Sequence, residues 1–198
     1  MEEGNKMKSN IIKNPLIAAA RPNNLGKAVE SNVSAVILME VKLNYLLQDE
    51  FKKNKDKKPI FIHLDLLKGL SNDVESVKFI KEYINPRGIV STKSTILNAA
   101  KKIGLMTIQR VFLIDNKSLK NSIASIIEND PDMVEVMPAL CGEIVNRLKS
   151  EINKPIILGG LIDKEEQIIE GLKHGADAIS FSKEELWNIK IDNEINIS

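Results

Sequence analysis

The sequence predicts an α/β fold, specifically a compact (β/α)8 TIM-type barrel formed by a single domain. Eight short apolar runs typical of buried strands alternate along the chain with amphipathic segments typical of helices. Because neighbouring parallel strands need a helical crossover between them, this alternation indicates parallel pairing. The length of 198 residues suits one domain near the lower size limit of the barrel fold.

An open doubly wound sheet is the alternative arrangement of the same elements. Such a sheet usually carries its glycine-rich loop after the first strand. Here the first apolar run ends in Ala-Ala-Ala-Arg-Pro, and the paired glycines come late, at Gly159 and Gly160. The position of these glycines favours the closed barrel.

The strands are placed on runs rich in Ile, Val, Leu and Ala, which suit a sheet buried on both faces. In chain order they are Leu16–Arg21, Ala35–Glu40, Pro59–Asp65, Gly88–Thr92, Met106–Phe112, Met133–Pro138, Pro155–Leu161 and Ala178–Ser182.

The helices are placed where apolar residues recur three and four positions apart. Asp73 and its neighbours predict a cap before one such segment, and Gly104 and Gly175 predict the ends of two others. The apolar stripes run through Val74–Ile84, Ile96–Ile103, Leu119–Ile127, Ile144–Ile152 and Ile168–Leu172.

Composition predicts a cytoplasmic protein. The single cysteine, Cys141, excludes an internal disulfide and fits a reducing compartment. No apolar run approaches the roughly 20 residues that span a bilayer, and the N-terminus lacks a signal-peptide core, so no membrane partner is expected. Residues 1–13 and 190–198 are predicted to be disordered tails around a barrel over 14–189.

Two strand ends late in the chain predict a phosphate site. Gly159 and Gly160 follow an apolar run, where the absence of a Cβ lets backbone N–H groups approach an anion. Ser180 and Ser182 end the last strand and add hydroxyl donors. In (β/α)8 barrels the loops after strands seven and eight usually hold phosphate, so a small phosphorylated ligand is expected.

Polar residues on other strands predict the rest of a pocket at the same mouth. His63 and Asp65 share one face of the third strand, and Glu135 lies within the sixth. Gln109 and Arg110 occupy opposite faces of the fifth strand, and we expect the amide of Gln109 to converge on the mouth with the imidazole and the carboxylate. At the rim, the expected cations are Arg21 and Lys93.

Each of these residues also has a structural interpretation. His63 is equally explained as a hydrogen-bonded core residue, and Asp65 as a cap of the segment that follows it. Lys93 suits the solvated start of a helix, and Arg110 an ion pair in the helix layer. Cys141 is best explained as a small packed residue.

A lysine cluster precedes the third strand, away from the predicted mouth. Because five lysines in seven residues form a positive patch, contact with RNA phosphates is one interpretation, and a solvated helix end that complements the helix dipole is the other. The lysines are Lys52, Lys53, Lys55, Lys57 and Lys58. The net charge of +1 does not by itself indicate a nucleic-acid-binding protein, so RNA binding would depend on a local patch.

Metal and nucleotide signatures are missing from the sequence. HExxH and CxxC spacings, a P-loop and a GxGxxG loop do not occur, and no nucleophile elbow supports a catalytic triad. We therefore expect no metal and no cofactor.

Seven segments, in order from residue 14 to Trp187, resemble the glycerol-3-phosphate-responsive antiterminator family, regulators of glycerol uptake operons. Ser-Thr-Lys-Ser followed by Thr-Ile-Gln-Arg is the specific part of the match. The segments are Asn14-Pro-Leu-Ile-Ala-Ala-Ala-Arg21, Ile62-His-Leu-Asp65 with Gly69-Leu-Ser71, Gly88-Ile-Val-Ser-Thr-Lys-Ser94, Leu105-Met-Thr-Ile-Gln-Arg110, Val134-Glu-Val-Met-Pro138, Leu158-Gly-Gly-Leu-Ile162 and Ser180-Phe-Ser-Lys183.

The resemblance implies a sensor of glycerol 3-phosphate that, when loaded, acts on leader mRNA to promote transcription antitermination. It implies that Gly159, Gly160, Ser180 and Ser182 hold the phosphate. The residues implied to contact the glycerol part or shape the pocket are Arg21, His63, Asp65, Lys93, Gln109, Arg110 and Glu135. A homodimer is a reasonable expectation for such a regulator.

Barrels with this phosphate site are mostly enzymes, so an isomerase, aldolase or lyase acting on a small phosphorylated metabolite is the alternative function. The family motifs favour a regulator that is not an enzyme.

Overall fold

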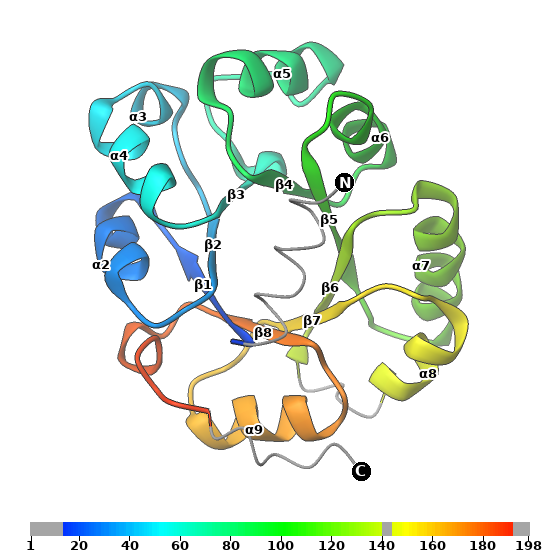
Figure 1. Cartoon of the computed structure of the whole chain (residues 1–198). Helices are drawn as coiled ribbons and strands as arrows, with labels where there is room; N and C mark the ends of the chain where they lie inside the picture. Colours follow the sequence, from blue (N-terminus) through cyan, green and yellow to red (C-terminus); the bar gives the residue numbers. More distant parts are fainter. Residues whose placement is uncertain (1–13, 140–143, 192–198) are drawn as a thin grey trace.

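In the computed structural model, which describes residues 14–139 and 144–191, eight parallel strands close into a barrel in chain order (Figure 1). Each strand pairs with the next, and β8 pairs with β1. The predicted (β/α)8 barrel is confirmed. The strands are β1 (Leu16–Ala20), β2 (Ala35–Leu38), β3 (Ile60–His63), β4 (Gly88–Ser91), β5 (Met106–Phe112), β6 (Met133–Met137), β7 (Ile156–Gly159) and β8 (Ala178–Phe181).

All eight predicted strands are present, but most are shorter at their ends than predicted. At two of these ends, the backbone turns out of the sheet directly after the last strand hydrogen bonds. Glu40 and Leu161, both expected in strands, have φ of 51° and 60° and turn the chain into the loops after β2 and β7. Gly160 is also left-handed, with φ of 82°, which suits a residue without a Cβ.

The helices surround the ring of strands (Figure 1). Asp73 caps α5 by accepting a hydrogen bond from the Ser76 N–H at 2.9 Å, as the sequence predicted. Gly104 and Gly175 are left-handed after α6 and α9, also as predicted. The α-helices are α2 (Leu25–Glu30), α3 (Leu43–Leu46), α4 (Asp49–Lys57), α5 (Val74–Phe79), α6 (Ser94–Lys102), α7 (Asn116–Asn129), α8 (Ile144–Glu151) and α9 (Glu165–Lys173).

Short helical turns complete the connections. The 3-10 turns are η1 (Pro22–Asn24), η2 (Leu64–Leu66) and η5 (Glu184–Leu186), and α5 continues into a π-helical turn, η3 (Ile80–Ile84). Trp187, after η5, is buried and its indole N–H donates to the Phe181 carbonyl at 3.2 Å. This contact holds the segment after η5 against β8.

The barrel interior is packed with side chains and is not a pore. Its apolar cluster consists of Ile17, Ala35, Ile37, Phe61, Val90, Met106, Ile108, Met133, Ile157 and Ala178. A second, larger apolar cluster lies between the strands and the helices. Above the interior cluster, at the carboxyl ends of the strands, the inward-facing residues become polar, as expected for the functional end of this fold.

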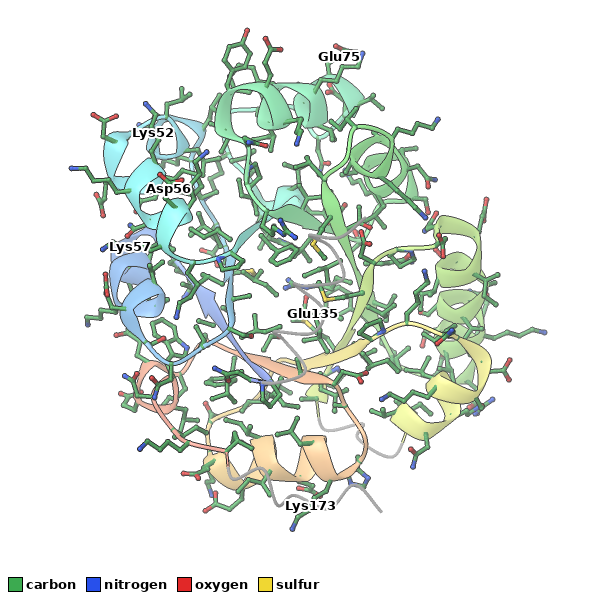
Figure 2. The ribbon with its side chains drawn as sticks, viewed as in Figure 1. Lys52, Asp56, Lys57, Glu75, Glu135 and Lys173 are labelled. Atoms are coloured by element: carbon green, nitrogen blue, oxygen red, sulfur yellow. The ribbon has the colours of Figure 1, made fainter. Side chains whose placement is uncertain are left out.

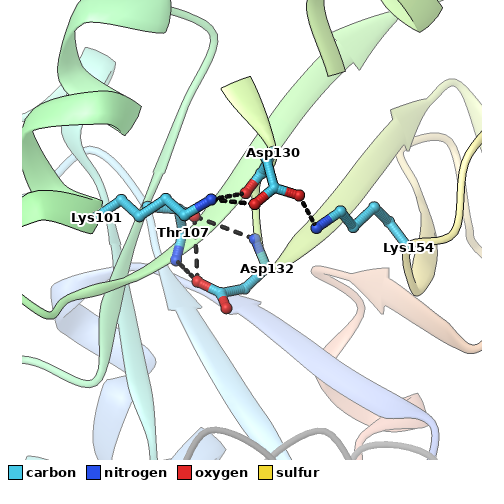
Figure 3. A network of polar contacts seen from close by, with 5 residues as sticks. All are labelled: Lys101, Thr107, Asp130, Asp132 and Lys154. Carbon is cyan, nitrogen blue, oxygen red and sulfur yellow. Dashed lines mark hydrogen bonds and ion pairs between the residues drawn. The ribbon is translucent and has the colours of Figure 1, made fainter. Parts of the chain in front are cut away.

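Polar contacts fasten the opposite, N-terminal end of the barrel. Asp130, left-handed at the end of α7, accepts hydrogen bonds from Lys101 and Lys154 (Figure 3). These bonds lower the pKa of the Asp130 carboxyl to about 2. Beside it, the Thr107 N–H donates to Asp132 at 2.9 Å and joins the starts of β5 and β6.

The predictions for Cys141, for the tail at residues 1–13 and for residues 192–198 of the predicted tail 190–198 lie outside the described residues, and Ile191, the last described residue, packs against the core. Within the described part of the chain, no helix combines the length and the apolar character that crossing a membrane requires.

Candidate functional site

A buried ion pair lies inside the polar layer of the barrel. The Arg110 Nε donates to Glu135 Oε2 at 2.7 Å, and the two side chains are 4% and 0% exposed. The strand register explains this contact, because Arg110 and Glu135 are directly paired residues on β5 and β6. Figure 2 shows Glu135 near the centre of the ring of strands. Such a pair is stable only when both charges are satisfied, so each residue depends on the other.

Ser180 supplies the second contact to the same carboxylate. Its hydroxyl donates to Glu135 Oε1 at 2.6 Å, and Ser180 is buried on β8. Gly159, opposite Ser180 on β7, must be a glycine, because a Cβ there would lie 2.3 Å from the Ser180 Oγ and 3.1 Å from Glu135 Oε1. Gly159 thus gives Ser180 and Glu135 the space to meet.

A cavity of about 180 Å³ opens above this buried layer, which we call the mouth cavity. It brings together strand ends from both sides of the point where the barrel closes. Its lining residues are Ala19, Arg21, Met39, Arg110, Met137, Gly160, Leu161, Ile162, Ser180, Phe181 and Ser182. Two cationic groups, two hydroxyls and a glycine backbone in one concave site suit a small anion.

An ion pair stands at the rim of the mouth cavity. Arg21 Nη2 lies 2.8 Å from Glu40 Oε1, with both side chains about half exposed. This hydrogen bond holds the pKa of the Glu40 carboxyl below its ordinary value. Arg21 is therefore held by a carboxylate in a position that lines the cavity.

His63 lies at the end of β3, buried to 4% exposure, and neither ring nitrogen has a hydrogen-bond partner among the described residues. Burial and, second, the positive charge of Arg110 together lower the pKa of the imidazole to about 4, against the opposing effect of Asp65. His63 is therefore neutral near pH 7, with one donor and one acceptor free.

The glycerol-3-phosphate responsive antiterminator model matches residues 16–187. The chain belongs to this family. The barrel, the mouth cavity and the late glycine pair all fall within the matched range.

Related proteins agree with this family assignment. A glycerol uptake operon antiterminator regulatory protein of Listeria monocytogenes has 30% sequence identity and a TM-score of 0.80, over 87% of this chain and 94% of that chain. A glycerol uptake operon antiterminator-related protein of Thermotoga maritima has 29% identity and a TM-score of 0.75, over 88% and 98%. The Escherichia coli K12 protein YgcP is 30% identical over 89% of this chain and 93% of its own length.

The antiterminator fold brings many of the predicted site residues together. Arg21, Arg110, Gly160, Ser180 and Ser182 line the mouth cavity. Glu135 and Gly159 lie in the layer that Ser180 joins to the cavity.

Gln109 does not reach the mouth, and that prediction was wrong. Its side chain faces the helix layer, where its Nε2 donates to Ser125 at 2.9 Å and its Oε1 accepts from Asn129 at 3.1 Å. Since neighbouring residues on a strand face opposite ways, Arg110 faces the interior instead of the helix layer. The inward residue of β5 is thus the guanidinium and not the amide.

Asp65 and Lys93 lie away from the cavity lining. Asp65 accepts hydrogen bonds from the Ser91 hydroxyl at 2.6 Å and from the Thr92 N–H at 2.7 Å, fixing the loop after β4. Burial works to raise the pKa of Asp65, but these bonds outweigh it and the pKa lies below the ordinary value. Lys93 precedes α6 with an exposed side chain, as the structural interpretation expected.

Sequence reasoning missed the apolar part of the lining and the partner of Arg21. Met39, Leu161 and Ile162 carry no chemical signature, so only the fold places them at the cavity. Glu40 was interpreted as the end of a strand, and its ion pair with Arg21 depends on a left-handed backbone that the sequence does not announce.

We predict that His63 makes stability fall below neutral pH. The folded pKa of about 4 lies under the ordinary 6.5, so between these values the unfolded chain binds more protons than the folded protein. Stability should therefore decrease as the pH falls from about 6.5 to about 4, by about 2 kcal/mol between pH 7 and pH 5. Urea unfolding at both pH values measures this loss.

The His63→Leu variant should lose most of this pH dependence. His174→Leu is the matched control, because His174, the other histidine of the chain, lies at the end of α9. An unchanged pH slope in His63→Leu would contradict the assignment.

Proposed function

We propose that this antiterminator family member binds glycerol 3-phosphate in the mouth cavity and, when loaded, binds leader mRNA and promotes antitermination of glycerol-utilisation genes. The observation that carries the proposal is the cavity itself. It lies where β7 and β8 end and combines Arg21, Arg110, Gly160 and Ser182. We propose that the protein works in the cytoplasm, without a cofactor.

The phosphate is assigned to the side of the cavity formed by Gly160 and Ser182. Gly160 leaves its backbone open, because a Cβ added at this position would have its nearest neighbouring atom 3.8 Å away. Ser182 is exposed, and its hydroxyl is available as a donor. Arg21 and Arg110, although each is paired with a carboxylate, can supply guanidinium donors to the phosphate, and guanidinium–phosphate bonds are among the stronger polar contacts. Ser180 contributes by holding Glu135 until the ligand competes for its hydroxyl.

The glycerol hydroxyls are assigned to the floor of the cavity. His63 is not one of the residues that line the cavity, but its neutral ring has an unused donor and acceptor and lies close enough to Arg110 to be affected by the Arg110 charge. A polyol can satisfy both nitrogens, which otherwise remain buried without partners among the described residues. Met39 and Met137 provide apolar walls for the carbon chain.

The direct test is stabilisation by glycerol 3-phosphate. A ligand present at a hundredfold excess over its Kd should raise the free energy of unfolding by about 2.7 kcal/mol. Differential scanning fluorimetry with glycerol 3-phosphate and with glycerol alone measures this. No shift at millimolar glycerol 3-phosphate would overturn the proposal.

Gly160→Glu should abolish this stabilisation while the fold survives. The substitution places a carboxylate in the cavity and costs roughly 1–2 kcal/mol, because φ is 82° at this position. Gly175→Glu is the matched control, since Gly175 has φ of 88° and lies outside the mouth cavity. Retained stabilisation in Gly160→Glu would show that the phosphate binds elsewhere.

An enzyme acting on a small phosphorylated metabolite is the second candidate, favoured by the neutral, buried His63 at the carboxyl end of β3, whose ring nitrogens lack partners in the described part of the chain. Against it, both oxygens of Glu135 already accept hydrogen bonds, from Arg110 and Ser180, which gives this carboxylate a structural role. Phosphorus NMR of glycerol 3-phosphate incubated with the protein separates the two functions. A new phosphorus signal would favour the enzyme, and binding without product the sensor.

A further inference from the structure

A second cavity, of about 390 Å³, lies at the opposite end of the barrel, where the chain enters β3, β4 and β5. We call it the N-terminal groove. Its lining residues are Lys55, Asp56, Lys57, Lys58, Pro59, Lys81, Asn85, Pro86, Arg87 and Gly104. Five cationic side chains face a single carboxylate in this lining, so the groove is strongly positive in a protein whose net charge is only +1.

Neutral oxygens hold several of these lysines in place. Lys55 Nζ donates to the Ile84 carbonyl at 2.7 Å. Lys58 Nζ donates to the carbonyls of Ser31 and Val33 at 2.5 and 2.8 Å. A neutral carbonyl positions an ammonium without adding a negative charge beside it, whereas burial lowers the pKa of the Lys58 ammonium.

Two further lysines complete the wall. Lys81 Nζ donates to the side-chain carbonyl of Asn85 at 3.1 Å, again a neutral partner. Lys57 is paired with a carboxylate, Glu30, at 2.6 Å. The π-helical turn η3 contains Lys81 and ends at Ile84, directly before Asn85, and so carries much of one wall of the groove.

Elsewhere on the N-terminal end, lysines meet carboxylates instead. Asp130 pairs with Lys101 and Lys154, and Asp177 pairs with Lys149 at 3.0 Å. The groove differs in that Lys55, Lys58 and Lys81 donate to neutral oxygens, so the positive charge of these three lysines is not offset by the group that holds them.

We propose that the N-terminal groove binds the phosphate backbone of the leader mRNA, an inference that rests on the proposed function. Cations contributed by two separate chain segments, 55–58 and 81–87, suit a chain of phosphates better than one small anion. The lining contains no aromatic side chain on which a base would stack. We therefore expect the groove to bind RNA through its phosphates, without recognising the base sequence.

This assignment separates the lysines of the sequence cluster into two groups. Lys55, Lys57 and Lys58 line the groove, whereas Lys52 and Lys53 are exposed on α4 and do not. Figure 2 shows Lys52 and Lys57 at different places along α4, at the periphery of the barrel. The two groups provide variants and controls from one helix.

The test is fluorescence anisotropy with a fluorescein-labelled RNA hairpin carrying single-stranded arms, in glycerol 3-phosphate, over a series of salt concentrations. Lys81→Gln should weaken binding several-fold and reduce the slope of log K against log salt by about 0.7–0.9, the effect of one lost phosphate contact. Lys53→Gln, which removes the same charge from the exposed part of α4, should leave the slope unchanged.

Gly104→Glu provides an independent variant. It adds a carboxylate to the groove at a left-handed position, with φ of 76° and no described atom within 4 Å of the new Cβ. We expect roughly tenfold weaker RNA binding and unchanged stabilisation by glycerol 3-phosphate. Gly175→Glu carries the same charge and backbone strain outside the groove and should bind RNA normally.

If Lys81→Gln and Gly104→Glu bind RNA more weakly while both control variants bind it normally, the result supports the N-terminal groove as the RNA-binding site. Normal binding in those two variants overturns it and places the RNA on another face. If the unmodified protein binds no RNA with glycerol 3-phosphate present, the proposed function fails with it. That outcome is distinct, because it appears before any variant is made.

Discussion

Glu135→Leu is expected to lower the free energy of unfolding by about 3–5 kcal/mol, because the variant leaves a charged guanidinium buried without its counter-ion. Arg110 is 4% exposed and donates to Glu135 at 2.7 Å. Ser180 would lose its acceptor as well. Urea unfolding monitored by circular dichroism and by the fluorescence of Trp187 measures the loss.

The double variant Arg110→Met/Glu135→Leu separates charge from packing. Replacing both members of a buried pair with apolar residues of similar volume removes the desolvation cost as well as the attraction. We expect the double variant to be more stable than Glu135→Leu alone. If it is less stable, the contribution of Glu135 is one of shape and not of charge balance.

Arg21→Gln is expected to weaken glycerol 3-phosphate binding about 30-fold, the effect of one hydrogen bond to a charged group. Glu40→Gln should act in the opposite direction, because Glu40 holds Arg21 at 2.8 Å and competes with the phosphate for it. Isothermal titration calorimetry measures both affinities.

Lys27→Gln is the control for this pair of variants. Lys27 is an exposed cation that pairs with Glu184 at 3.0 Å and does not line the mouth cavity. Its removal should leave affinity close to that of the unmodified protein. Equal weakening in Lys27→Gln and Arg21→Gln would indicate a general loss of positive field in place of a specific contact.

The fold was predictable because the barrel repeats one local pattern. Each strand is buried on both faces and so appears in the sequence as a continuous apolar run, such as Met106–Phe112. Glycines such as Gly104 and Gly175 mark the ends of helices. The pattern also located Gly159 and Gly160 correctly at the end of β7. What it left out were the strand ends, where Glu40 and Leu161 leave the ladder through backbone angles that neither side chain favours.

The site was predictable in its residue types and less so in their directions. Period two separates Gln109 from Arg110 but does not say which one faces inward. That choice depends on partners far along the chain, because Ser125 and Asn129 satisfy the amide while Glu135 satisfies the guanidinium. Burying either group on the wrong face would leave it unpaired, a cost visible only once the helices are in place.

The packed apolar core beneath the polar layer blocks passage from the mouth cavity through the barrel. Phe61, Ile157 and their neighbours close the lower half of the barrel, so a molecule that enters between the strand ends has to leave by the same opening. A ligand therefore enters and leaves through the same opening, and the Arg21–Glu40 ion pair lies at its rim. A bound molecule must break its contacts with the cavity lining and then pass Arg21 and Glu40 before it can leave.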